Sequence, residues 1–242
     1  PVIPTTSTTG SSKVYLAAFR TDAVRPFWRG FLKAYQRGSD GEVPVDDDGV
    51  PLDEAIVWDA GQELSEKAAA DRTIYTIAGG SRQSFTKANT AITTALLDVA
   101  TTADRDNVID FTRGIDAYDE DSDTNVTEER QWKLGDIFHA NPVLVSPPFL
   151  PLSDSTYLTF KQSNASRTTV VLAAANDGMI HAFRESDGAE LWAFIPPDLL
   201  PTLENLTVRS AEHAFYLDAS PIVTDIKISG NWKTIAVFGQ RR

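Results

Sequence analysis

The stretch from Asn176 to Pro196 constrains the fold of this chain more than any other, because it alternates short apolar runs with tight-turn signals. It reads N-D-G-M-I-H-A-F-R-E-S-D-G-A-E-L-W-A-F-I-P and follows the apolar run 169–175. The dipeptide Asp-Gly at 177–178 and again at 187–188 favours hairpin turns, since glycine adopts positive φ at little cost. Strand, turn, strand, turn and strand therefore follow one another with almost no spacer, which is typical of a β-propeller blade.

Several other phrases of the chain are equally specific. They are R-G-F-L-K-A-Y at 29–35, W-K-L-G-D-I-F-H-A-N-P-V at 132–143, H-A-F-Y-L-D-A-S-P-I-V-T-D at 213–225 and W-K-T-I-A-V-F-G-Q-R-R at 232–242. Together with 176–196 they resemble the quinoprotein-like propeller of the PilC/PilY family, the tip-associated adhesins and biogenesis factors of bacterial type IV pili. The resemblance covers Trp28 to Arg242 and is more specific after residue 142 than before it.

The predicted fold class is mainly β, a quinoprotein-like β-propeller that is incomplete in this chain and carries insertions and a few short helices. Residues 1–12 are expected to be a linker or lead-in, and 13–242 the N-terminal part of the propeller domain. Within that part, 36–131 is expected to be rich in insertions and 142–242 to hold regular blades. Because a blade takes about 40–45 residues, further blades are expected beyond residue 242.

Local patterns predict the individual elements. Strands are expected at 13–19, 31–35, 56–58, 73–78, 143–146, 169–175 and 232–238, and a short helix over 64–71. The strongest helix signal spans Asn89–Val99, where Asn89 can cap the helix and Ile92, Leu96 and Val99 share one side. Residues 104–129 are polar and strongly acidic and carry no helix prediction. Trp192 is expected to be buried, and Trp192 and Trp232 fit packing between blades.

Charge and composition exclude several classes of function. The 242 residues have a formal net charge of −12, which argues against binding to nucleic acid or to an anionic lipid surface. The chain has no cysteine, so disulfides, thiolate metal sites and cysteine nucleophiles are excluded. No apolar run approaches the ~20 residues that span a bilayer.

The acidic segment after Arg113 is the main candidate for a metal site. Its predicted calcium ligands are Asp119, Asp121, Asp123, Asn125 and Glu128. The first four stand at alternate positions, as in the first half of an EF-hand loop, and calcium prefers six to eight oxygen ligands. Thr124 stands where such a loop has glycine, and Arg130 where it has glutamate. A solvated acidic loop therefore stays open as the alternative.

The remaining polar residues suggest weaker candidates. Asp46 and Asp48 are a second possible calcium site, with a surface turn as the alternative. The three histidines, His139, His181 and His213, are expected to be satisfied structural residues, and no catalytic or cofactor-binding residue is predicted. Asp177 and Asp218 are expected to accept hydrogen bonds in turns.

What the resemblance implies is a non-enzymatic module of type IV pilus biogenesis and adhesion. It would promote pilus assembly, oppose retraction and mediate surface attachment, with calcium as a modulator. The implied partners are minor pilins, the pilus tip complex and a host or abiotic surface. The implied location is the cell surface or pilus tip, reached through the periplasm and outer membrane of a Gram-negative bacterium.

Two other propeller functions stay open as alternatives. One is a pyrroloquinoline-quinone-type dehydrogenase. No quinone is expected, because the vicinal disulfide of many such enzymes needs cysteines that this chain lacks. The other is a periplasmic scaffold propeller, against which the long acidic insertions at 38–53 and 104–129 count.

Overall fold

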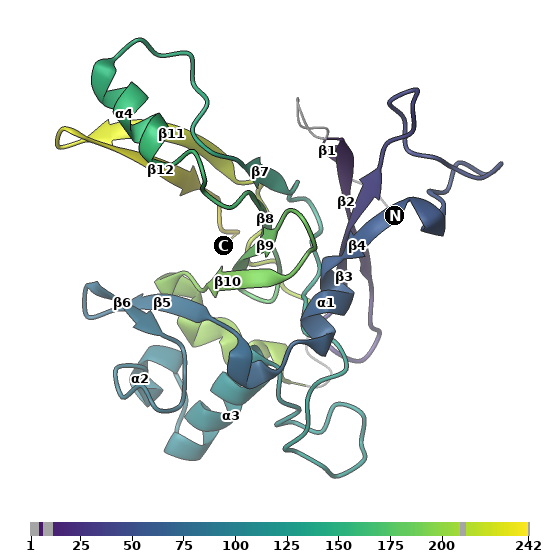
Figure 1. Cartoon of the computed structure of the whole chain (residues 1–242). Coiled ribbons are helices and arrows are strands. Elements are labelled where there is room, and N and C mark those ends of the chain that lie inside the picture. The colour runs from purple at the N-terminus through teal and green to yellow at the C-terminus, as the bar shows by residue number, and fades with distance from the viewer. Residues whose placement is uncertain (1–4, 7–11, 209–211, 242) are drawn as a thin grey trace.

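Strands dominate the computed structural model, which describes residues 5–6, 12–208 and 212–241 (Figure 1). Within those residues the strands form a four-stranded, a six-stranded and a two-stranded sheet. The predicted linker 1–12 lies mostly outside the described residues, although two of its residues form strand β1. No helix in the described part of the chain is both long and apolar enough to cross a membrane.

The four-stranded sheet is built from the first part of the chain. Its strands are β1 (Thr5–Thr6), β2 (Lys13–Arg20), β3 (Arg29–Gln36) and β4 (Ile56–Asp59). All neighbours pair antiparallel. Alternate residues such as Tyr15 and Ala17 are buried, as the two-residue period of a strand requires. The strands predicted at 13–19, 31–35 and 56–58 are confirmed.

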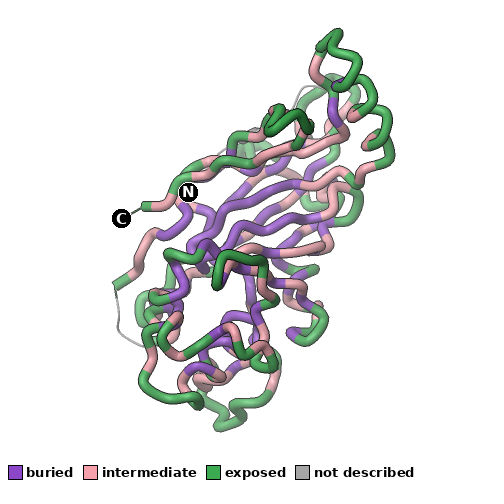
Figure 2. The backbone as a smooth tube through the Cα atoms, turned by 90° about the vertical axis from the view of Figure 1, so that its left-hand side faces the viewer, coloured by how far each residue is buried: buried purple, intermediate pink, exposed green. Residues whose placement is uncertain are grey.

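The six-stranded sheet joins the two halves of the chain, in the order β6-β5-β10-β9-β8-β7. Its strands are β5 (Ile74–Ala78), β6 (Ser81–Ser84), β7 (Val143–Val145), β8 (Val170–Ala174), β9 (Ile180–Arg184) and β10 (Glu190–Phe194). The two predicted hairpins connect β8, β9 and β10, and Gly178 and Gly188 adopt positive φ of 85° and 75° there. Only β10 and β5 run parallel. Buried backbone passes through the central strands (Figure 2).

The two-stranded sheet is a hairpin of β11 (Ile222–Ile228) and β12 (Asn231–Val237). Helix α4 (Ser155–Ser163), which the sequence did not predict, packs beside it. Trp232 donates its indole N–H to Thr156 Oγ1 at 2.9 Å and meets the ring of Tyr157 edge to face. The prediction that Trp192 is buried is confirmed only in part, since Trp192 packs against the core but stays partly exposed where β10 borders a groove.

The helices differ most from the sequence predictions. The helix predicted at Asn89–Val99 is wrong: only α2 (Thr94–Leu97) forms, because the Thr93 side chain caps it and Asp98 turns left-handed at φ 54°. Asn89 instead accepts a hydrogen bond from the amide of Ala91 and closes a turn. The longest α-helix, α3 (Thr102–Arg113), lies in the segment that carried no helix prediction. A reciprocal capping box between Thr101 and Asp104 starts it.

Shorter helical segments complete the chain. These are η1 (Asp53–Ala55), α1 (Ala60–Glu66), η2 (Ala69–Asp71) and η3 (Pro197–Leu206). The helix predicted over 64–71 begins at residue 60 instead, because the Asp59 carboxylate accepts the amides of Gly61 and Gln62. It ends before residue 67, and a separate 3₁₀ turn follows.

The segment 132–136 threads between the four-stranded sheet and the turn that joins β8 and β9. The Gly30 amide donates to Leu134 O at 2.9 Å. A Cβ atom on Gly30 would lie 1.9 Å from Gly135 O, and one on Gly135 would lie 2.5 Å from the Asp177 amide nitrogen. Both glycines are therefore needed for this close approach of three backbone segments.

A buried ion-pair network connects the sheets to α3. Arg72 pairs with Glu190 through two N–O contacts of 2.9 Å, and its third guanidinium nitrogen donates to the last carbonyls of α3 at 3.0 Å. His181 Nδ1 lies 2.8 Å from Glu190 Oε1, and its Nε2 lies 3.0 Å from Asp177 Oδ2. Asp177 also accepts the amides of Gly135 and Met179. Two cations thus balance two carboxylates in the core.

The network favours the charged forms of His181 and Glu190. Burial works against a charge on His181, but the Asp177 charge and the hydrogen bonds that the ring donates to Asp177 and Glu190 raise its pKa to about 9. Burial likewise opposes the Glu190 charge, yet Arg72 and His181 hold the pKa of Glu190 well below its usual value. The structural role predicted for His181 and the turn hydrogen bond predicted for Asp177 are confirmed.

We predict that Arg72→Met destabilises the protein by about 3–5 kcal/mol, because it leaves Glu190 buried beside only one remaining cation. Urea unfolding measures the loss. The matched control is Arg184→Met, which removes the exposed partner of Asp187 and should cost about 1 kcal/mol or less. Equal losses in the two variants would contradict a structural role for the buried pair.

Stability should also fall in alkaline solution as His181 loses its proton. The folded pKa of about 9 exceeds the usual 6.5, so the folded state holds the extra proton more tightly than the unfolded chain. The stability from His181 is therefore complete below pH 6.5 and is lost as pH rises through 9. NMR titration of the imidazole and urea unfolding between pH 6 and 9.5 measure this. A His181 midpoint near 6.5 would refute it.

Candidate metal centre

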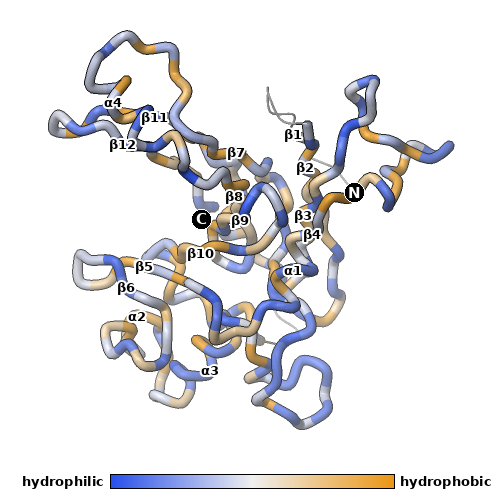
Figure 3. Tube along the Cα trace, in the orientation of Figure 1, coloured by the Kyte–Doolittle hydropathy of each residue, from blue (hydrophilic) through white to orange (hydrophobic). Residues whose placement is uncertain are grey.

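The acidic loop, defined as residues 114–130, leaves the end of α3 and returns to the same place. Its base is closed by the bridge between Ile115 and Glu129 and by amide hydrogen bonds of 2.8 and 2.7 Å between 116 and 128 and between 130 and 114. Gly114 has φ 121°, and a Cβ there would lie 2.5 Å from the Lys133 side chain. The loop is mostly hydrophilic (Figure 3).

Two groups of three carboxylates form inside the acidic loop, and Asp121 belongs to both. One is Asp119, Asp121 and Asp123, and the other is Asp116, Asp121 and Glu128. In each group one oxygen from every member lies within 4.8 Å of the others. The structure thus brings together four of the five residues that the sequence singled out. It adds the buried Asp116, which the alternating pattern did not include although it opens the same acidic run.

Asn125 takes part in the local hydrogen bonds of the acidic loop. Its Oδ1 accepts the amide and hydroxyl of Thr127, and its Nδ2 donates to Glu128 Oε2 at 3.0 Å. Thr124 adopts φ 75°, so it supplies the left-handed conformation for which an EF-hand loop uses glycine. The Asp119 carboxylate accepts the Thr124 amide at 3.1 Å, which holds this uncommon conformation in place.

Glu120 is not available as a ligand, because Arg130 holds it. Arg130 Nε and Nη2 lie 2.6 and 3.2 Å from the two Glu120 oxygens. The guanidinium of Arg130 lies between two aromatic rings, 4.1 Å from the centre of Phe27 and 3.7 Å from that of Phe111. This buried cation–π arrangement fixes one side of the acidic loop.

The other carboxylates repel one another. Partial desolvation and then the charges of Asp123 and Asp121 raise the pKa of Glu128. Burial, followed by the charge of Glu120, raises the pKa of Asp116 against its amide hydrogen bonds. A divalent cation would relieve this repulsion. The donor set consists of hard carboxylate oxygens without nitrogen or sulfur, so it fits calcium.

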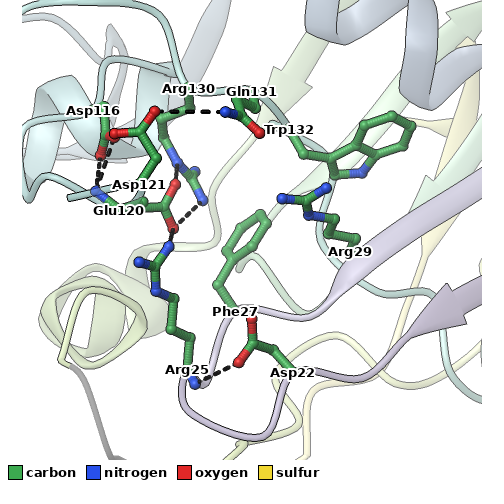
Figure 4. A pocket seen from close by; sticks show the side chains of 10 residues that line it. All are labelled: Asp22, Arg25, Phe27, Arg29, Asp116, Glu120, Asp121, Arg130, Gln131 and Trp132. Atoms are coloured by element: carbon green, nitrogen blue, oxygen red, sulfur yellow. Dashed lines mark hydrogen bonds and ion pairs between the residues drawn. The ribbon is translucent and has the colours of Figure 1, made fainter. Parts of the chain in front are cut away.

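The acidic loop borders a cavity of about 160 Å³ that it shares with the segment before β3. Its lining residues are Asp22, Arg25, Phe27, Arg29, Asp116, Glu120, Asp121, Arg130, Gln131 and Trp132 (Figure 4). Arg25 reaches across it to within 3.7 Å of Glu120. A conformational change in the acidic loop would therefore act directly on residues 22–29, which line the same cavity.

Asp46 and Asp48 lie in a tight surface turn. Asp46 Oδ1 accepts the amides of Asp48 and Val50, and Gly49 has φ 78°. Within the described residues, neither aspartate belongs to a group of three possible metal ligands. The hydrogen bonds of this surface turn thus account for the position of the Asp46 side chain.

Within the described residues, none of the three histidines belongs to a group of three possible metal ligands either. His213 stacks on Trp28 at 3.7 Å between ring centres. His139 pairs with Asp218 at 2.6 Å. The prediction that Asp218 accepts a hydrogen bond in its own turn is wrong, because the chain crossing at 139 brings the His139 amide and ring to it.

The comparisons with known proteins agree with this architecture. The family model of the PilY1 beta-propeller domain matches residues 134–242. The type IV pilus biogenesis factor PilY1 of Pseudomonas aeruginosa strain UCBPP-PA14 is 33% identical over 199 residues, which cover 74% of this chain and 17% of that protein. The factor of the same name in strain PAO1 is 38% identical over 156 residues, covering 60% and 13%. A Xylella fastidiosa PilY1 homolog is 33% identical over 112 residues, covering 43% and 9%.

The family match and the three sheets identify the fold of this chain as an incomplete β-propeller, as the sequence predicted. The chain belongs to the PilY1 family, of which it represents a segment. It spans 17% or less of the length of the three relatives described above. No solved structure matched the chain.

Calcium should stabilise the protein if the acidic loop binds it. At a hundredfold excess over the dissociation constant, the expected gain is about 2.7 kcal/mol. Asp121→Ala with Asp123→Ala should abolish the gain and leave the metal-free stability nearly unchanged, since removing crowded charges costs little. The control is Asp46→Ala with Asp48→Ala, which should keep the gain. Thermal unfolding with calcium and with a chelator measures both, and a wild type that calcium does not stabilise would contradict the site.

Two single variants distinguish the carboxylate groups in the same assay. Asp119→Asn weakens calcium stabilisation if the ion lies between Asp119, Asp121 and Asp123. Glu128→Gln weakens it if the ion lies in the group that contains Asp116. Both replacements keep an oxygen that can accept the local hydrogen bond, so the backbone of the acidic loop is preserved.

Proposed function

We propose that this chain is a propeller segment of a type IV pilus biogenesis factor that acts in the envelope or at the pilus of a Gram-negative bacterium. The observation that carries the proposal is its 33–38% identity to Pseudomonas proteins of that name. The family model of the PilY1 beta-propeller domain, which matches residues 134–242, also supports it.

The proposed role is non-enzymatic: the module promotes pilus assembly, opposes retraction and mediates attachment to a host or abiotic surface. Its proposed partners are minor pilins and the pilus tip complex. The chemistry of the interior supports a structural role. Four buried titratable residues form hydrogen bonds and ion pairs with one another and with backbone groups. They are Arg72, Glu190, His181 and Asp177.

Calcium is proposed to modulate this role through the acidic loop. The ion would supply positive charge where the carboxylates around Asp121 repel one another. Asp119, Asp121 and Asp123, or Asp116, Asp121 and Glu128, would hold it. The contact between Glu120 and Arg25 then links the acidic loop to the segment before β3. Ion binding would thus stiffen one edge of the propeller segment instead of activating a substrate.

Cells that lack the whole protein should make fewer surface pili and should twitch and adhere poorly. Blocking retraction should partly restore the pili, because the protein is proposed to oppose retraction. Counts of sheared surface pili, twitching zones and adhesion assays measure these effects. Normal piliation and adhesion without the protein would remove the pilus assignment.

Complementation separates the calcium role from the pilus role. A gene with Asp121→Ala and Asp123→Ala should restore the protein level but not calcium-dependent piliation. A gene with Asp46→Ala and Asp48→Ala should restore both. Full rescue by the first gene would refute calcium modulation and leave the biogenesis role standing.

A further inference from the structure

An apolar strap, defined as residues 146–154, joins β7 to α4 at the surface of the protein. Its Phe149 is 72% exposed and its Leu152 is 38% exposed, and Leu158 of the adjoining α4 is 51% exposed. Within the described residues, Phe149 is the one aromatic side chain among the large hydrophobic residues that are exposed. Figure 1 shows α4 and the β11–β12 hairpin projecting from the rest of the chain. Three large apolar side chains are thus presented to solvent on a projecting part of the molecule.

The apolar strap is held in place although it is exposed. Three of its nine residues are proline, and each proline fixes its own φ and restricts the residue before it to extended conformations. The Leu150 amide donates to the Tyr157 hydroxyl at 3.0 Å, and that hydroxyl donates to Asp225 Oδ2 at 2.7 Å. The Ser146 carbonyl accepts a hydrogen bond from Arg167. The strap therefore presents its apolar side chains at a small further cost in conformational entropy.

The backbone of the apolar strap offers few free hydrogen-bond donors. Proline has no amide N–H, and the amide of Leu150 is already bonded to Tyr157. Moving an unpaired amide out of water costs free energy, and this cost normally keeps irregular backbone away from hydrocarbon. The cost is lower for this strap than for an ordinary loop of the same length, so the strap is suited to contact with an apolar phase.

The charge around the apolar strap differs in sign from that of the whole chain. The arm, defined as residues 146–169 and 222–237, has a formal net charge of +2, against −12 for the chain. Its charged residues are Lys161, Arg167, Lys227, Lys233, Asp154 and Asp225. The exposed Lys161 follows Leu158 by three residues on α4, so the two are neighbours on the helix surface. The arm can therefore face an anionic surface that the chain as a whole would repel.

We propose that the arm is a contact site for a phospholipid surface. Phe149, Leu152 and Leu158 would enter the interfacial layer, and Lys161 would face the lipid phosphates. Exposed apolar side chains beside a basic residue are the pattern by which peripheral segments bind a bilayer. A protein partner that added a strand to the apolar strap would need backbone amides, and the strap has few to offer. The proposal goes beyond the pilus role and does not depend on it.

Co-sedimentation of the whole purified protein with vesicles of phosphatidylethanolamine and phosphatidylglycerol tests the proposal. Phe149→Ser with Leu152→Ser should lower the vesicle partition coefficient by about tenfold or more, because less apolar surface leaves water on binding. The control is Val24→Ser with Val57→Ser, which changes two exposed residues outside the arm and should bind as the wild type does. A wild type that does not sediment with vesicles, or equal binding by the two folded variants, would overturn the proposal.

A charge variant supplies an independent readout. Lys161→Gln should weaken binding to vesicles that contain phosphatidylglycerol by about fivefold at low salt, and should change binding to phosphatidylcholine vesicles little. The control is Lys87→Gln, which removes an exposed cation outside the arm and should bind as the wild type does. Equal losses in the two lysine variants would count against a lipid contact at the arm.

Hydroxyl-radical footprinting of the whole protein excludes other occupants of the apolar strap. Protection of Phe149 that appears only when vesicles are added supports the lipid contact, with Trp28, which lies outside the arm, as the internal reference. Full protection without vesicles would assign the strap to a contact within the protein. Protection without vesicles that is lost on dilution would assign it to a second copy. Either of these results, or fast labelling of Phe149 in vesicle-bound protein, would overturn the proposal.

Discussion

The pairing of Arg72 with Glu190 is the interaction on which the rest of the structure depends. It places a guanidinium from the first half of the chain against a carboxylate from the second, with both side chains fully buried. Neither charge is tolerable in the core without the other, so β10 must lie beside the segment that leads into β5. The parallel pairing of β10 with β5 follows from the same placement. The six-stranded sheet is therefore one unit, although its strands come from distant parts of the sequence.

The same constraint extends outward to the acidic loop. Arg72 also donates to the carbonyls that end α3, and the acidic loop begins there. His181 and Asp177 continue the network to the amide of Gly135, which follows the return of the acidic loop to the core. The charged acidic loop is thus anchored at both ends by buried polar contacts. An ion bound to its carboxylates would act on a segment whose ends are fixed.

Sequence patterns predicted the hairpins of 169–195 and most strands, because turn dipeptides and two-residue alternation act locally. They also singled out Asp119, Asp121, Asp123 and Glu128, since alternate carboxylates are visible in one dimension. They did not find Asp116 as a partner of Glu128, because the closed base of the acidic loop brings them together. The helix prediction at 89–99 failed for a different reason: the caps at Thr93 and Asp98 outweighed the apolar spacing.

By itself the sequence determined the class of fold, the family resemblance and the acidic loop, because turn glycines, strand alternation and charge runs are properties of neighbouring residues. Only the tertiary structure decided which charges are paired. The pairing of Arg72 with Glu190 and of Glu190 with His181 was not visible in the sequence, because Arg72 comes from a distant segment and all three side chains meet out of water. The exposed face of Trp192 was likewise decided in three dimensions. The burial of a residue depends on which elements pack against its strand, and the sequence of the strand alone does not say which elements these are.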